Sequence, residues 1–117
     1  MTRPLTPGEK LLIRWMLEHG TSEAPALLTQ LDQAQVTSFQ CPCGCASIEL
    51  IVNGLPEPSG AMGVVADFTF GTGNDLSGIF VYEKGGVLAG VEVSGYAGNA
   101  PRELPPLECL TPIESHD

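Results

Sequence analysis

Hydrophobic residues near the start of the chain recur with the period of an α-helix. The preceding segment Thr6-Pro7-Gly8-Glu9 has the form of a capping box, with a hydroxyl before the helix and a glutamate in its first turn. The pattern therefore predicts a helix that begins after Thr6 and ends near His19, with Gly20 as a left-handed stop. Its apolar stripe consists of Leu11, Leu12, Trp15 and Met16.

A second apolar stripe at helical spacing follows after a very short link. It consists of Leu27, Leu28 and Leu31. Because proline is tolerated only in the first turn of a helix, Pro25 indicates a start just after Thr21 or Ser22. The two segments together predict an αα-hairpin over about residues 7–33.

From Val36 onward the hydrophobic period changes from 3.6 to 2, which is typical of β-strands. The segment Lys84-Gly85-Gly86 predicts a tight turn between the last two strands. The predicted strands are 36–40, 47–52, 62–70, 76–83 and 87–94.

These elements predict an α+β fold in one domain, residues 1–117. An N-terminal αα-hairpin packs on an antiparallel sheet of four or five strands, about residues 36–94, in mostly meander order. A proline-rich tail, residues 95–117, is expected to be loop-like. On the strand 62–70 the alternation places Val64 and Phe68 on one side and Val65 and Asp67 on the other.

The hairpin 76–94 carries apolar side chains on both faces. Ile79 and Val81 alternate with Phe80 and Tyr82. Since one helical hairpin covers only one face of a sheet, the second face is left as an exposed patch, which is typical of an interaction site. We therefore expect a protein partner or a homodimer, unless the proline-rich tail folds back over that face.

The net charge of the chain argues against some classes of binding partner. The chain of 117 residues has a net charge of −9, and its five basic residues are scattered. This argues against nucleic-acid binding, which needs a clustered basic surface. No segment has the length of a membrane span, and no signal peptide precedes the first helix, so a cytoplasmic location is expected. Four carboxylates on separate strands could gather on the solvent face of the sheet: Glu49, Asp67, Glu83 and Glu92.

The segment Cys41-Pro42-Cys43-Gly44-Cys45 brings three of the four cysteines within five residues. Thiolates bind zinc and copper(I) well, and three of them converge easily if the backbone turns. Pro42 and Gly44 are poor residues for a central strand and indicate a kinked start to the strand that follows. Cys109 or His116 could supply a fourth ligand to a metal, with zinc as the candidate cofactor.

The cysteine pattern leaves three interpretations open. The chain has no Cys-x-x-Cys pair, the usual spacing of structural zinc sites, and free cysteines often behave as small buried hydrophobic residues. A redox or nucleophilic role would need a neighbouring base, and only His19 and His116 are available. No catalytic residue is therefore named, and an enzyme is the least supported class.

The layout resembles a group of small uncharacterised bacterial proteins with a helical hairpin, a Cys-x-Cys-Gly-Cys cluster and a C-terminal β-hairpin. The segments that carry the resemblance are residues 11–20, 41–48 and 88–93. The resemblance implies a bacterial cytoplasmic protein and no activity.

Two functional classes follow from the sequence. The first is a non-catalytic protein that binds another protein through its sheet or its acidic face. The second is a metal-binding or thiol-redox protein that uses Cys41, Cys43 and Cys45.

Overall fold

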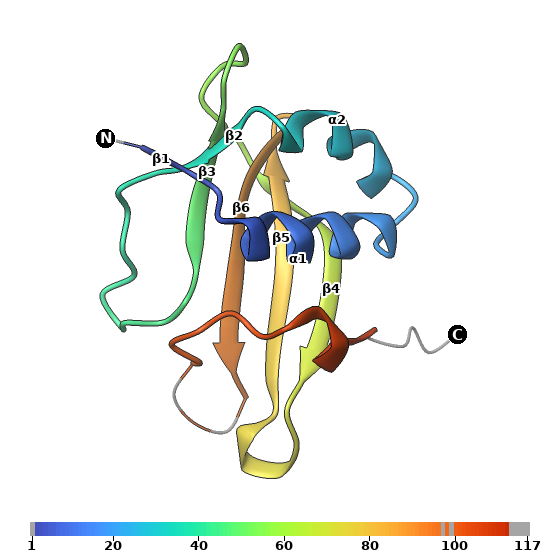
Figure 1. Cartoon of the computed structure of the whole chain (residues 1–117), viewed down its shortest axis with the longest axis vertical. Helices are drawn as coiled ribbons and strands as arrows, with labels where there is room; N and C mark the ends of the chain where they lie inside the picture. Colours follow the sequence, from blue (N-terminus) through green and yellow to red (C-terminus); the bar gives the residue numbers. More distant parts are fainter. Residues whose placement is uncertain (1, 97, 99, 113–117) are drawn as a thin grey trace.

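The structure is a computed structural model that describes residues 2–96, 98 and 100–112. It has the expected α+β architecture, with helices packed on one antiparallel sheet (Figure 1). No helix within the described residues combines the length and apolar character needed to cross a membrane. The elements in chain order are β1 (Arg3–Pro4), α1 (Pro7–Glu18), η1 (Ala24–Leu27), α2 (Leu28–Leu31), β2 (Ala34–Val36), β3 (Ile48–Val52), β4 (Met62–Phe70), η2 (Gly73–Asp75), β5 (Ser77–Lys84), β6 (Val87–Gly95), η3 (Leu107–Cys109) and β7 (Thr111–Pro112).

The sheet has seven strands in the described part of the chain, in the order β1-β2-β3-β6-β5-β4-β7. The prediction of four or five strands missed β1 and β7, which are two residues long and too short to give a periodic pattern. The largely meander order is confirmed for β4, β5 and β6. Strand β3 lies beside β6 rather than β4, so residues 53–61 cross from one side of the sheet to the other.

The first strand of the predicted sheet, 36–40, was assigned to residues that come after most of the observed strand. The observed strand β2 starts at the buried Ala34, whose register partner is Val52. It ends at Val36 because the chain then turns into an exposed loop.

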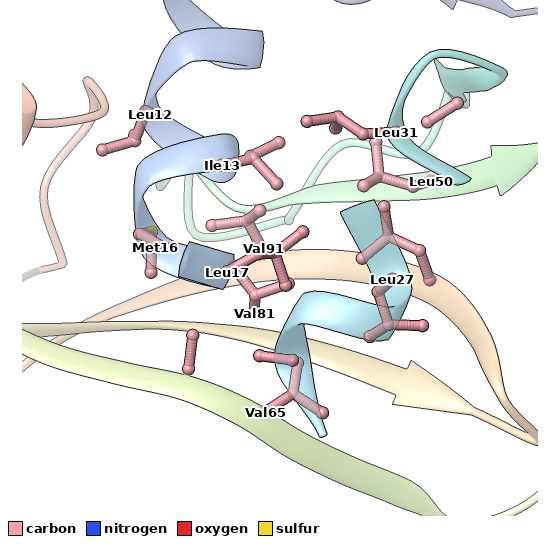
Figure 2. Packing of buried hydrophobic residues seen from close by; sticks show 14 of the residues in the cluster. Leu12, Ile13, Met16, Leu17, Leu27, Leu31, Leu50, Val65, Val81 and Val91 are labelled. Atoms are coloured by element: carbon pink, nitrogen blue, oxygen red, sulfur yellow. The ribbon is translucent and has the colours of Figure 1, made fainter. Parts of the chain in front are cut away.

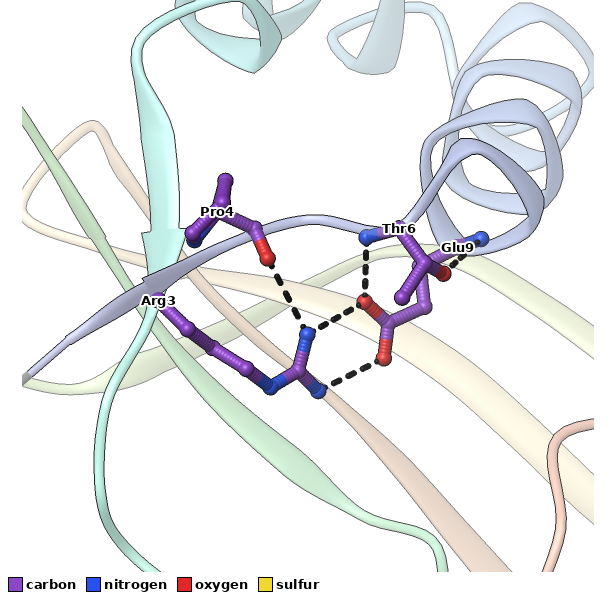
Figure 3. A network of polar contacts seen from close by, with 4 residues as sticks. All are labelled: Arg3, Pro4, Thr6 and Glu9. Carbon is purple, nitrogen blue, oxygen red and sulfur yellow. Dashed lines mark hydrogen bonds and ion pairs between the residues drawn. The ribbon is translucent and has the colours of Figure 1, made fainter.

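The capping box of α1 is confirmed and extends into an ion pair (Figure 3). The Thr6 N–H donates to Glu9 Oε1 at 2.8 Å, and the Glu9 N–H donates to Thr6 Oγ1 at 3.1 Å. The Arg3 guanidinium donates to both oxygens of Glu9 at 2.9 Å each. One carboxylate therefore joins β1 to the first turn of α1.

The second helix is shorter than predicted. It consists of the 3₁₀ turn η1 followed by the single turn α2, and it ends at Leu31 rather than Gln33. Pro25 lies in the first turn, as expected.

Gly20 does not have the predicted left-handed conformation. It is required instead for a close backbone approach, because the Thr21 N–H donates to Val65 O at 2.8 Å. A Cβ on Gly20 would lie well inside van der Waals contact with that same oxygen.

One face of the sheet, here called the covered face, carries the hydrophobic core (Figure 2). Leu12, Ile13, Met16 and Leu17 of α1 pack on it and are almost fully buried. The largest buried side chain from the sheet is Phe68, which contacts the Trp15 ring at a centroid distance of 5.1 Å. Trp15 thus packs at the edge of the core.

The tail packs on the covered face too, where η3 lies beside α1 (Figure 1). Leu104, Leu107 and Leu110 contact the core cluster, and β7 pairs with the edge of β4. Apart from Tyr96, which lies across Gly78, the described tail residues therefore leave the opposite face, here called the open face, uncovered.

A β-bulge in β4 alters the predicted alternation. The register shifts between Val64 and Ala66, so that the adjacent Val65 and Ala66 are both buried while Val64 is exposed. A bulge inserts one residue and reverses the faces that follow, which the sequence pattern does not reveal. Glu83 also departs from expectation, since it pairs with the buried Leu88 and lies on the covered side.

Replacing Gly20 with Ala should destabilise the fold by about 1–3 kcal/mol or more, because the new methyl group must displace the Val65 carbonyl. The matched control is Gly8→Ala in the first turn of α1, where a Cβ meets nothing within 4 Å. That control should be neutral or stabilise by up to about 1 kcal/mol. Chemical denaturation of both variants measures the difference, and equal stabilities would contradict the contact.

Replacing Glu9 with Gln should lower stability by about 1 kcal/mol near neutral pH. The Arg3 hydrogen bonds lower the pKa of the Glu9 carboxyl in the folded state. Its contribution is therefore complete above the unfolded pKa of about 4.3 and is lost as the pH falls through the lower folded value. Thermal melts from neutral to acidic pH should show the two proteins converging, and a constant gap would argue against this ion pair.

Candidate metal centre

The three clustered cysteines lie in the loop between β2 and β3, at the left of Figure 1. The Gly44 N–H donates to Cys41 O at 2.9 Å, which closes a turn with Pro42 and Cys43 at its centre. Gly44 has a φ of 80°, in the left-handed region that favours glycine. The kinked start to the strand is thus confirmed as a turn that ends before β3.

This turn brings the three sulfur atoms together. The Sγ atoms of Cys41, Cys43 and Cys45 all lie within 4.8 Å of one another. Those of Cys41 and Cys43 are 2.9 Å apart. Two thiolates on one tetrahedral zinc ion lie about 3.8 Å apart, given Zn–S bonds of about 2.3 Å. Small side-chain rotations would therefore place all three around a metal ion.

Cys45 is the thiol best prepared to ionise. Burial raises its pKa, but hydrogen bonds from the Ser47 hydroxyl and backbone, and from the neighbouring thiols, outweigh this and lower the pKa to about 7. The Ser47 Oγ lies 3.2 Å from Cys45 Sγ and accepts the Val93 N–H at 3.0 Å. The Cys45 thiol donates to this oxygen, and once the thiol has ionised the Ser47 hydroxyl can donate to the thiolate instead.

Cys41 behaves in the opposite way. Its hydrogen bond with the Cys43 thiol is the main cause that raises its pKa, to about 11. Once Cys45 has lost its proton, a second and third thiolate at this distance require a cation to offset their repulsion. A metal ion held among the three sulfur atoms would supply that positive charge.

One arginine from the tail lies against the cluster. Arg102 Nη1 would be 2.8 Å from a Cβ on Gly44, so the guanidinium covers the turn. The tail is held there by the Ala46 N–H, which donates to Pro101 O at 2.9 Å. Sequence reasoning treated Arg102 as one of the scattered bases, because its position depends on how the tail folds.

A cavity of about 1060 Å³ opens beside the cluster. Cys41 and Cys45 border it, together with residues of the N-terminal segment, such as Glu9, and of the tail, such as Arg102. Three segments that are distant in the sequence form its walls, so no local pattern predicts it.

The remaining predicted ligands and bases lie elsewhere or outside the description. Cys109 is exposed on η3 and is not part of the three-sulfur cluster. His116 lies outside the described residues. His19 stacks on Trp15 at a centroid distance of 4.3 Å, and its Nδ1 lies 2.8 Å from the Trp15 carbonyl oxygen.

In reduced, metal-free protein, Cys45 should react with iodoacetamide faster than Cys41, with a pH midpoint near 7. Replacing Ser47 with Ala should move that midpoint up toward the usual cysteine value of about 8.5, because the thiolate loses its donor. Ser38→Ala, an exposed serine in the same loop, is the control. Peptide mass spectrometry follows each site, and equal reactivity of Cys41 and Cys45 at pH 7 would count against this account.

The sequence resemblance noted above rested on the helical hairpin, the cysteine cluster and the C-terminal β-hairpin. Of these, the structure supports the cluster as a chemical feature, with three thiols in contact range. Comparison of the chain with protein-family models, curated proteins and solved structures finds no match.

Proposed function

We propose that this protein binds a thiophilic metal ion through Cys41, Cys43 and Cys45. The observation that carries the proposal is the convergence of their three Sγ atoms within 4.8 Å in one short turn. Zinc is the first candidate, and copper(I) has the same preference for thiolates. Metal binding would drive all three thiols to the thiolate form and release their protons.

The surroundings of the cluster support a charged metal complex. Three thiolates around a zinc ion carry a net charge of −1, which the neighbouring Arg102 guanidinium would offset. The Ser47 hydroxyl, hydrogen-bonded to Cys45, would hold that ligand in place from outside the coordination sphere.

The fourth ligand of a tetrahedral zinc ion could come from two sources. Cys109 and His116 remain the protein candidates. A small donor molecule or water reaching the metal through the adjacent cavity is the other, since Cys41 and Cys45 border that cavity. Zinc sites with three protein ligands and one exchangeable position are well known.

Native mass spectrometry after loading with zinc, and separately with copper(I), should show one metal ion per chain. Cys43→Ser should lower the affinity at least about tenfold, while Cys109→Ser should leave it nearly unchanged if the three clustered thiols suffice. Loss of metal in both variants would indicate a site of four thiolates. Retention of metal by the Cys43 variant would refute the proposal.

Metal should stabilise the wild type only through the linkage between binding and folding. The free energy of unfolding should increase by RT ln(1 + [metal]/Kd), and the melting temperature should rise accordingly. The reason is that the cluster lies in a loop at the margin of the core, where only Cys45 of the three cysteines packs against the core residues. A metal-free protein that unfolds completely would contradict the placement of the site outside the core.

Thiol–disulfide exchange is the second candidate, favoured by the 2.9 Å between the sulfur atoms of Cys41 and Cys43. In that reaction an oxidised small disulfide accepts two electrons, the two protein thiols lose their protons, and a Cys41–Cys43 bond forms. Treating the protein with such a disulfide and mapping the linked peptides tests it. A stable mixed disulfide on Cys45 alone would argue against a Cys41–Cys43 pair.

A further inference from the structure

The open face of the sheet has a defined arrangement of aromatic and acidic side chains. The strand register places residues that share this face in rows across the central strands. One row runs Glu49, Gly90, Tyr82 and Val64 across β3, β6, β5 and β4. The next runs Glu92, Phe80 and Asp67 across β6, β5 and β4. A strip of two aromatic rings is thus bordered by three carboxylates.

The aromatic strip is built on glycine. Tyr82 lies across Gly90, and Tyr96 lies across Gly78, so closely that a Cβ on either glycine would collide with a tyrosine hydroxyl. The Phe80 and Tyr82 rings meet edge to face at 5.9 Å. These contacts hold the two tyrosines over the glycines and fix the surface that they present.

Exposure rises from the centre of the strip to its borders. Tyr82 is buried, at 8% exposed, and Phe80 is half-buried, while Tyr96 and Val64 at the borders are 55% and 44% exposed. Glu57 and Pro58, from the crossing segment 53–61, close over one end. Within the described residues, α1, α2 and the tail segment that carries Leu104, Leu107 and Leu110 lie on the other face.

The three bordering carboxylates are exposed and create a negative potential over the strip. Burial and the charges of Glu49 and Glu92 raise the pKa of the Tyr82 hydroxyl, which places both charges close to the ring. The Lys84 Nζ lies 5.9 Å from the Tyr82 centroid, so one cation of the chain already approaches this ring.

A cavity of about 180 Å³ lies at the Tyr82 end of the strip. Glu49, Glu57, Tyr82 and the Lys84 stem line it. Carboxylates combined with an aromatic wall suit the end of a lysine or arginine side chain, whose alkyl part packs on the ring while its charge faces the acids.

We propose that the open face docks an extended basic segment of another protein, whose sheet-facing side chains, every second residue, include both lysine or arginine and apolar residues. The apolar residues would lie over Phe80 and Val64, and the basic residues would pair with Glu49, Asp67 and Glu92. A second copy of this chain is disfavoured, because face-to-face docking would oppose two sets of three carboxylates. Nucleic acid and anionic membranes are repelled by the same charges.

The test uses two synthetic peptides of about eight residues, long enough at about 3.3 Å per residue to cross the four central strands. One repeats Lys-Lys-Leu-Leu and the other repeats Glu-Glu-Leu-Leu, so that each face of the extended peptide carries both charged and apolar side chains. Titration into isotope-labelled full-length protein should show amide shifts on β4, β5 and β6 with the lysine peptide only. The affinity should fall when salt is raised from about 0.01 M to about 0.15 M.

Two sets of variants with the same change in net charge locate the site. Glu49→Gln, Asp67→Asn and Glu92→Gln together should weaken binding at least about tenfold. Glu18→Gln, Glu23→Gln and Glu108→Gln neutralise three exposed carboxylates of the helix and tail layer and should change it less than about threefold. Val64→Ser should weaken binding more than Leu11→Ser, although Leu11 of α1 is the more exposed of the two, at 57% against 44%.

Three results would overturn the proposal. They are undetectable binding of the lysine peptide, equal effects of the two triple variants, and a wild-type dimer that Val64→Ser dissociates. The last would assign this face to a second copy of the chain. The metal-site variant Cys43→Ser should bind the peptide normally, so this proposal and the metal proposal succeed or fail separately.

Discussion

The central strands of this sheet carry apolar residues on both faces, while the described helices and tail form a layer on only one. That asymmetry governs the rest of the structure. Ile79 and Val81 meet α1 and the tail and form the core, which supplies the main stabilisation through burial of apolar surface. Phe80 and Tyr82 alternate with them and must lie on the opposite face. On that face two tyrosines lie over glycines, and carboxylates stand at the borders.

The elements with a strong local signal were predictable from the sequence. The capping box fixed the start of α1, and strict alternation gave the bounds of β4 correctly. The errors have tertiary causes. Gly20 serves a contact with Val65, a residue distant in the sequence, and the bulge at Val65 is set by pairing with β5. The position of β3 beside β6 depends on the crossing segment, which has no periodic pattern.

For the candidate metal centre too, the sequence predicted the local features and missed those that depend on tertiary contacts. Three cysteines within five residues, with proline and glycine between them, could be interpreted from spacing alone, because the turn that unites them is local. The neighbouring residues that affect the thiols could not be predicted from spacing. Ser47 is oriented by a hydrogen bond from β6, and Arg102 arrives with the tail. The fourth cysteine, Cys109, is placed on η3 by the path of the tail, outside the cluster.

The cysteine loop, residues 37–47, begins and ends at two strands that are already paired, since β2 and β3 are neighbours in the sheet. The entropy cost of closing this loop is therefore already part of the folding of the sheet. A metal ion would have to order only the short turn inside the loop. Release of the metal would likewise relax only that turn. This architecture suits reversible loading, in which the ion exchanges while the sheet and both of its faces keep their form.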